Sequence, residues 1–160
     1  MSETSKIRRI VVGVTGSAAS IEALRWAAEE ARMSGGELTV VHAWLPPDRL
    51  YPAPYAPARV RGSPKEAQRL AEAELAAAMR QVFVQAPAIK VREILECGSP
   101  ARVLLAAAGG ANLLVLGGHR SKSPLTHTVG PVAAACLRRS PCPVVVVSPS
   151  MRAEPAAHMA

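Results

Sequence analysis

Two glycine-rich stretches have the composition of loops that hold an anionic ligand. The first is Gly13-Val14-Thr15-Gly16-Ser17, and the second begins at Gly117-Gly118-His119-Arg120 and reaches Gly130-Pro131. Glycine lets a ligand approach the backbone, and a loop that enters a helix presents free N–H groups that favour phosphate. Glycines after strands also serve as plain turn residues, so the pattern alone allows either interpretation.

The second stretch also carries side chains that could contact a phosphate. Exposed loop residues of the same types need no function, so both interpretations stay open for them. These residues are His119, Ser121, Lys122, Ser123, Thr126, His127 and Thr128.

Several kinds of chemistry are excluded by residues that the chain lacks. Asp48 is the only Asp among twelve acidic residues, which excludes an EF-hand loop and a kinase-type metal site. Cys97, Cys136 and Cys142 have no CxxC spacing, which argues against zinc and predicts reduced thiols. Cys136 and Cys142 are predicted to be packed thiols, with redox centres as the alternative. The nucleophile-elbow, Walker and His-x-Gly-His patterns are missing. We therefore predict no catalytic residue and no metal site.

Composition also restricts the partners. The formal charge is +7, but aromatic residues make up only 3% of the chain, which excludes modules that stack nucleic-acid bases on aromatic rings. The basic residues are scattered, so we predict no nucleic-acid partner; nonspecific association is the alternative, and it predicts steep salt dependence. No apolar run nears the roughly 20 residues of a membrane span, and the run that follows residues 1–9 is too short for a secretory leader. We expect a cytoplasmic protein without a membrane partner.

Five short apolar runs have the character of buried parallel strands, and helical patterns separate them. The predicted strands cover 7–14, 38–45, 89–95, 113–116 and 144–147. The helices are expected to begin at Ser17 or Ser20, at the capping box Ser63-Pro64-Lys65-Glu66, at Ser99-Pro100, and at Val129 or Gly130. Their inward-facing residues are predicted to be Ile21, Leu24, Ala28 and Ala31; Ala67, Ala71, Leu75, Ala78 and Val82; Val103, Leu104 and Ala107; and Val132, Cys136 and Leu137.

This alternation predicts an α/β fold: one doubly wound, five-stranded parallel sheet with helices on both faces. We expect a single domain over 1–149, with a proline-rich loop at 46–62 that forms no regular helix and a disordered tail at 150–160. In such sheets a ligand binds beyond the carboxyl ends of the strands, where the strand order reverses. The usual reversal lies beside the first strand.

Several segments together resemble the universal stress protein (UspA) family over about residues 6–149. They are Ile10-Val-Val-Gly-Val-Thr-Gly-Ser17, Val40-Val41-His42-Ala43, Gly98-Ser99-Pro100, Leu114-Val-Leu-Gly-Gly-His-Arg120, and Ser140-Pro-Cys-Pro-Val-Val-Val-Val147. The resemblance implies strand order 3-2-1-4-5 and an adenine nucleotide alpha hydrolase-like fold. It also implies a homodimer formed through the strand at 144–147, a flat apolar edge that invites pairing.

The family's nucleotide-binding branch carries Gly-x2-Gly-x9-Gly-Ser/Thr after the fourth strand. Gly117 and Gly130 keep the spacing, but Arg120 and Pro131 stand at the second glycine and at the closing Ser/Thr. Thr15 replaces the acidic residue usual after the first strand. Pro131 offers neither a hydroxyl nor an N–H to a phosphate, whereas Arg120 could pair with one directly.

The resemblance implies a stress-response binding or regulatory module with a degenerate adenine-nucleotide site. The alternative is a functional ATP-binding protein, slowly hydrolysing ATP in the same cleft. ATP or another adenine nucleotide is the expected ligand in both cases. The residues expected to line the site are Gly13, Val14, Thr15, Val41, Leu116, Gly117, Gly118, Arg120, Gly130, Pro131 and Val132.

Overall fold

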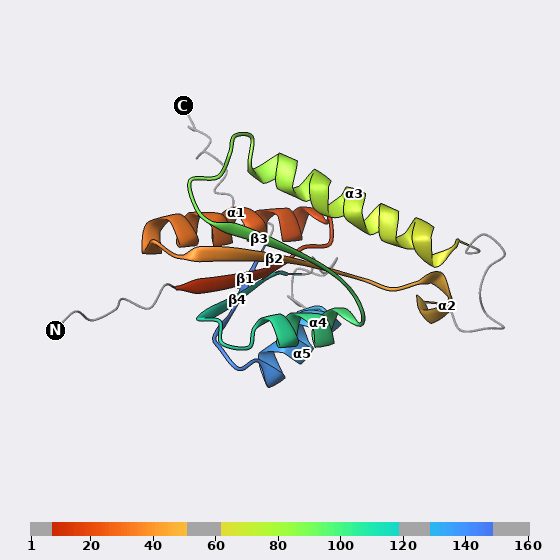
Figure 1. The fold of residues 1–160 in the computed structure, drawn as a ribbon. Coiled ribbons are helices and arrows are strands. Elements are labelled where there is room, and N and C mark those ends of the chain that lie inside the picture. Colours follow the sequence, from red (N-terminus) through yellow and green to blue (C-terminus); the bar gives the residue numbers. More distant parts are fainter. Residues whose placement is uncertain (1–7, 51–61, 119–128, 149–160) are drawn as a thin grey trace, which may run out of the picture.

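The computed structural model describes residues 8–50, 62–118 and 129–148, and its centre is a five-stranded parallel sheet (Figure 1). The strand order is β3-β2-β1-β4-β5. This confirms the predicted fold class and strand order. The strands are β1 (Arg9–Gly13), β2 (Glu37–Trp44), β3 (Val91–Cys97), β4 (Leu113–Gly117) and β5 (Val144–Val147).

Helices cover both faces of the sheet, as Figure 1 shows. On one face lie α1 (Ala18–Ser34) and α3 (Pro64–Val82), and on the other lie α4 (Pro100–Ala107) and α5 (Pro131–Arg139). A single helical turn, α2 (Pro47–Leu50), follows β2. The chain therefore forms three layers, with the strand order reversing between β1 and β4.

The central strands β1 and β4 are buried from both sides, which explains why their sequences are continuous apolar runs. Successive side chains of a strand point to opposite faces. Ile10 and Val12 belong to a core cluster with Leu24 of α1 and Leu75 of α3. Val11 belongs to a second cluster, which includes residues of α4 and α5.

Local signals in the sequence fix where most helices begin and end. Ser17 caps α1 by accepting a hydrogen bond from the Ser20 amide, and Gly35 ends this helix with a φ of 63°. Ser63 and Glu66 form the predicted capping box of α3. Ser99 occupies the N-cap of α4, but its side chain makes no capping hydrogen bond.

The structure corrects three details of the sequence interpretation. The turn α2 lies inside the stretch predicted to hold no helix, because Pro47 stands at its start, where a missing N–H costs nothing. β1 and β3 both begin two residues later than predicted, and β3 also ends two residues later. Leu137 was expected to face inward but is 49% exposed, since Ala133 and Cys136 form the buried face of α5.

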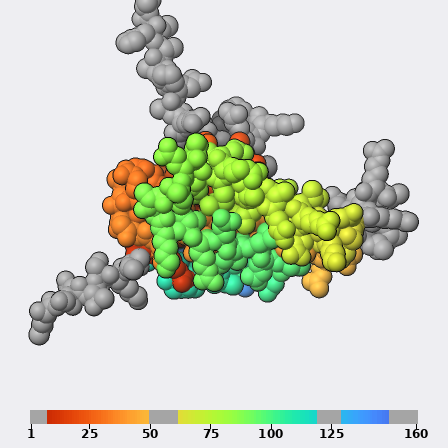
Figure 2. Space-filling view, turned by 45° about the horizontal axis from the view of Figure 1, so that its top comes forward, coloured from red at the N-terminus to blue at the C-terminus, as the bar shows by residue number. Residues whose placement is uncertain are grey.

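The two edges of the sheet differ in their side chains. β5 consists of four valines, whereas β3 exposes Arg92, Glu93 and Glu96. In the space-filling view, α3 and the chain around β3 form much of the visible surface (Figure 2). Within the three described ranges, no helix is long and apolar enough to span a membrane. Residues 51–61, the loop 119–128 and the predicted tail 150–160 lie outside these ranges.

Candidate functional site

A cavity of about 140 Å³ opens at the carboxyl ends of β1, β2 and β4, on the side of the sheet that α4 and α5 cover. Its walls are mainly apolar, and its described lining contains no ionisable side chain. This position is the reversal of strand order at which sheets of this kind bind ligands. The lining residues are Gly13, Val14, Thr15, Ser17, Ser20, Val41, Ala43, Pro100, Leu104, Leu116, Gly117, Val132 and Ala133.

Seven of the eleven residues predicted for the site lie in this lining: Gly13, Val14, Thr15, Val41, Leu116, Gly117 and Val132. Gly118 and Pro131 adjoin lining residues in the chain without lining the cavity themselves, and Gly130 lies two residues before Val132. Gly118 donates its N–H to the carbonyl of Val147 at 2.7 Å, so β5 already uses this group. Arg120, together with the loop residues His119, Lys122 and His127, lies outside the described residues.

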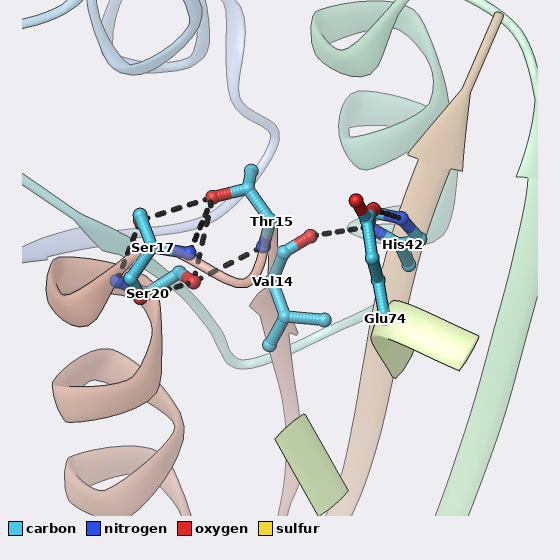
Figure 3. A network of polar contacts seen from close by, with 6 residues as sticks. All are labelled: Val14, Thr15, Ser17, Ser20, His42 and Glu74. Atoms are coloured by element: carbon cyan, nitrogen blue, oxygen red, sulfur yellow. Dashed lines mark hydrogen bonds and ion pairs between the residues drawn. The ribbon is translucent and has the colours of Figure 1, made fainter. Parts of the chain in front are cut away.

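Three hydroxyl groups line the cavity where β1 leads into α1 (Figure 3). The Thr15 and Ser17 hydroxyl oxygens are 3.0 Å apart. The Ser20 hydroxyl, which is buried, accepts a hydrogen bond from the Thr15 amide at 3.1 Å. Thr15 and Ser17 are exposed, so a ligand can reach their hydroxyls, although these hydroxyls already bond to each other and Ser17 also caps α1.

Two glycines let the surrounding elements approach the cavity closely. A Cβ at Gly117 would lie 2.6 Å from the backbone carbon of Ala19, so only glycine lets the end of β4 touch the start of α1. A Cβ at Gly13 would lie 2.9 Å from the Leu104 side chain. Packing therefore requires glycine at position 117, where backbone is the obstacle, whereas at position 13 the leucine methyl groups would have to shift.

On the side of the cavity formed by α5, the first residues of the helix offer few hydrogen-bond donors to an anion. Gly130 is its N-cap and has no side chain, and Pro131, the first helical residue, has no N–H. Val132 and Ala133 therefore bring apolar side chains to the cavity from this helix. The sequence signal at Gly130 correctly marked a helix start beside the cavity.

Residues of β2 form hydrogen bonds with the turn that follows β1. Val14 donates its N–H to the Val41 carbonyl at 2.9 Å, and its own carbonyl lies 2.7 Å from Nδ1 of His42. His42 is 5% exposed, and its Nε2 lies 3.0 Å from a carboxylate oxygen of Glu74 on α3 (Figure 3). A buried histidine thus joins the turn to the long helix on the far face of the sheet.

Sequence reasoning missed the cavity residues that the packing contributes. Ala43, Pro100, Leu104 and Ala133 are apolar residues whose pattern is that of ordinary core positions. Ser17 and Ser20 were interpreted as helix caps, and Ser17 is the cap as well as a lining residue. Of these residues, only Ser20 could have been recognised from the sequence, because a hydroxyl on the apolar face of a helix is unusual.

The comparisons with known proteins agree with this architecture. Residues 6–148 match the model of the universal stress protein family. The chain belongs to this family. A universal stress protein of Mycobacterium tuberculosis is 32% identical over 149 residues, which are 93% of this chain and 51% of that protein. The chain thus spans about half the length of the curated relatives that it matches.

Solved structures of the family share the fold. The universal stress protein UspA from Lactobacillus plantarum is 23% identical, with a TM-score of 0.63, and the match covers 90% of this chain and 99% of that one. A universal stress protein solved in complex with cAMP is 27% identical, with a TM-score of 0.57. That match covers 91% of this chain and 100% of the other.

Proposed function

We propose that this chain binds an adenine nucleotide in the cavity between β1 and β4 and acts as a stress-response binding or regulatory module. The observation that carries the proposal is a preformed apolar cavity with hydroxyls along one side, at the reversal of strand order. Apolar walls suit a purine ring, and the hydroxyls of Thr15 and Ser17 suit a ribose. The related protein in complex with cAMP supports this choice of ligand.

In this proposal the part of the site that faces the phosphate contributes less to binding than the part that faces the base and the ribose. Pro131 withholds an N–H and a hydroxyl at the start of α5, and Gly118 gives its N–H to β5. Hydrogen bonds to charged groups contribute about 1.5–3 kcal/mol each, so the loss of two such donors weakens phosphate binding by orders of magnitude. Arg120 is the residue that we propose to offset part of this loss by pairing with the phosphate.

We assign the cavity a binding role because none of its described lining residues can act as a general base. Slow ATP hydrolysis in the same cavity is the alternative function. It predicts turnover of labelled ATP that survives repurification and disappears when the cavity is filled by mutation.

Calorimetric titration with cAMP, and with ATP and magnesium, tests the binding proposal. Ala43→Leu adds a larger side chain inside the cavity and should weaken binding at least about tenfold, since methylene-sized misfits are worth about 1–3 kcal/mol. Ala73→Leu makes the same change on the exposed side of α3 and should leave binding unchanged. Equal affinity in wild type and Ala43→Leu would place the ligand elsewhere.

We also propose that the protein works as a homodimer in a reducing compartment, the cytoplasm. β5 is an edge strand of four valines with no partner strand on its outer side in the described chain, which favours pairing with a second copy. Cys97, Cys136 and Cys142 are unpaired, as thiols are in reducing compartments.

A further inference from the structure

The peptide unit between Val14 and Thr15 lies at the mouth of the cavity and is held at both ends by side chains (Figure 3). Its carbonyl faces His42 Nδ1 at 2.7 Å. Its N–H donates to the Ser20 hydroxyl at 3.1 Å. Because a peptide unit is planar, these two contacts together set its rotation and therefore the position of Thr15.

His42 reaches this peptide from the side of the sheet that faces away from the cavity. Val41 and Ala43 line the cavity, and alternate residues of a strand point to opposite faces, so His42 points toward α3. A ligand in the cavity therefore has no direct access to the imidazole ring. His42 is a positioning residue that acts on the cavity through the Val14 carbonyl.

The two hydrogen-bond partners of the imidazole ring determine how many of its nitrogens must carry a proton. A carbonyl oxygen only accepts hydrogen bonds, so Nδ1 must donate to Val14. An ionised carboxylate also only accepts, so the 3.0 Å contact between Nε2 and Glu74 needs a second proton between these two atoms. The full bridge from Val14 to Glu74 therefore exists only while the His42–Glu74 pair holds that second proton.

Glu74 is the charged group that faces His42 from the elements packed around it. On β3, the residue in register with His42 is the apolar Leu95. On α1, Glu22 and Arg25 form an ion pair with each other at 3.6 Å. Among the described residues, the ion pair that includes His42 is the one with Glu74, whose side chain is 56% exposed.

We propose that the His42–Glu74 pair is a proton-dependent clamp on the cavity. With the second proton present, a charge-assisted hydrogen bond fixes the Val14–Thr15 peptide and α3 is tied to the turn. When the proton leaves, the Nε2 lone pair faces the carboxylate, Glu74 turns to solvent, and the bond to Val14 becomes a weaker neutral one. The orientation of Thr15 then loosens, and ligand affinity falls with rising pH.

The clamp can be tested on the ligand-free full chain by nuclear magnetic resonance. Across a pH series, the chemical shift of the Thr15 amide should change with the same midpoint as that of the His42 ring. Glu74→Gln should move the two transitions together, because an amide then replaces the carboxylate as the partner of Nε2. Glu72→Gln removes a charge from the same helix without touching the bridge and should leave both midpoints unchanged.

Two results would overturn the proposal: a Thr15 amide that does not follow the His42 ring, or a common midpoint that Glu74→Gln leaves in place. His42→Gln should abolish the transition of Thr15. If that variant fails to fold, Glu74→Gln still decides, because its side chain is largely in solvent.

The effect on ligand binding rests on the proposed function and is measured separately with cAMP, whose phosphodiester does not titrate over this pH series. Wild-type affinity should fall about threefold as the pH rises through the transition of the Thr15 amide, and in Glu74→Gln the fall should move together with that transition. The other histidines, His119, His127 and His158, are common to both proteins, so any contribution from them cancels in the comparison. If cAMP does not bind at all, the proposed function fails, while the coupling between Thr15 and His42 still decides the clamp.

Discussion

Pro131 is the residue at which the start of α5 differs most from a phosphate-binding helix. Replacing it with Ser supplies both a backbone N–H and a hydroxyl beside Val132, which lines the cavity. We expect Pro131→Ser to raise the affinity for ATP at least about tenfold, which is the effect of one added hydrogen bond to a charged group, and more if both new donors reach the phosphate.

Calorimetry measures this effect, and Pro64→Ser provides the matched control. Pro64 also stands at the start of a helix, but α3 lies on the other face of the sheet. The control should bind ATP as wild type does. An unchanged affinity in Pro131→Ser would mean that the phosphate does not approach α5.

The cysteines provide a second prediction at this scale. Burial raises the pKa of the Cys136 thiol, whereas Cys97 is exposed at the end of β3. A raised pKa leaves less of the reactive thiolate at any given pH. Iodoacetamide at mildly alkaline pH should therefore modify Cys97 well before Cys136, as peptide mass spectrometry would show. Equal rates would contradict the buried position of Cys136.

Single residues were predictable from the sequence where a turn or a cap required them. Gly117 and Thr15 follow directly after predicted strands, and both lie in the cavity lining. Leu104 and Ala133 line the same cavity, but nothing in the sequence separates them from ordinary core residues. Leu137 was wrongly placed inward, because a step of one residue along a helix turns the side chain by about 100°.

At the scale of elements, the caps of α3 and α4 look alike in the sequence but differ in the structure. Ser63 makes both halves of a capping box with Glu66, whereas the Ser99 side chain makes no capping bond. Ser63→Ala should lower the free energy of unfolding by about 1 kcal/mol. Ser99→Ala should leave it nearly unchanged, and urea denaturation measures both. Equal losses in the two variants would contradict the difference between the caps.

The existence of each strand was predictable, whereas several bounds were not: the starts of β1 and β3 were both placed two residues early, and only β5 had both of its bounds predicted correctly. β1 and β4 are buried on both faces, so their apolar runs are unbroken. β3 lies at the edge, with its exposed and half-buried residues mixed, and its start was placed two residues early. The helical turn at Pro47 was missed because prolines mark both loops and helix starts.

At the scale of the whole molecule, the topology brings together turns that are far apart in the sequence. The chain crosses from β1 through β2 and β3 before β4 returns to pair with β1. Thr15 and Val132 thereby reach one cavity. The alternation of strands and helices predicted the layers, whereas the resemblance to the family was needed for the strand order.

The apolar outer edge of β5 leads to a prediction about assembly. Among the described residues no strand pairs with that side of β5, and β5 itself holds no charged residue of the kind that blocks such pairing. We expect equilibrium sedimentation at micromolar concentration to give the mass of a dimer. A monomer at every concentration in that range would contradict the proposed homodimer.

The central claim, that the cavity between β1 and β4 binds an adenine nucleotide, is tested most directly by mapping backbone amide shifts during titration with cAMP. We predict saturable shifts at Thr15, Ser17, Ala43, Gly117 and Val132, all of which line the cavity. Amides at the opposite end of the strands, such as those of Glu37 and Arg92, should not move. The absence of saturable shifts around the cavity, or shifts confined to that opposite end, would contradict the claim.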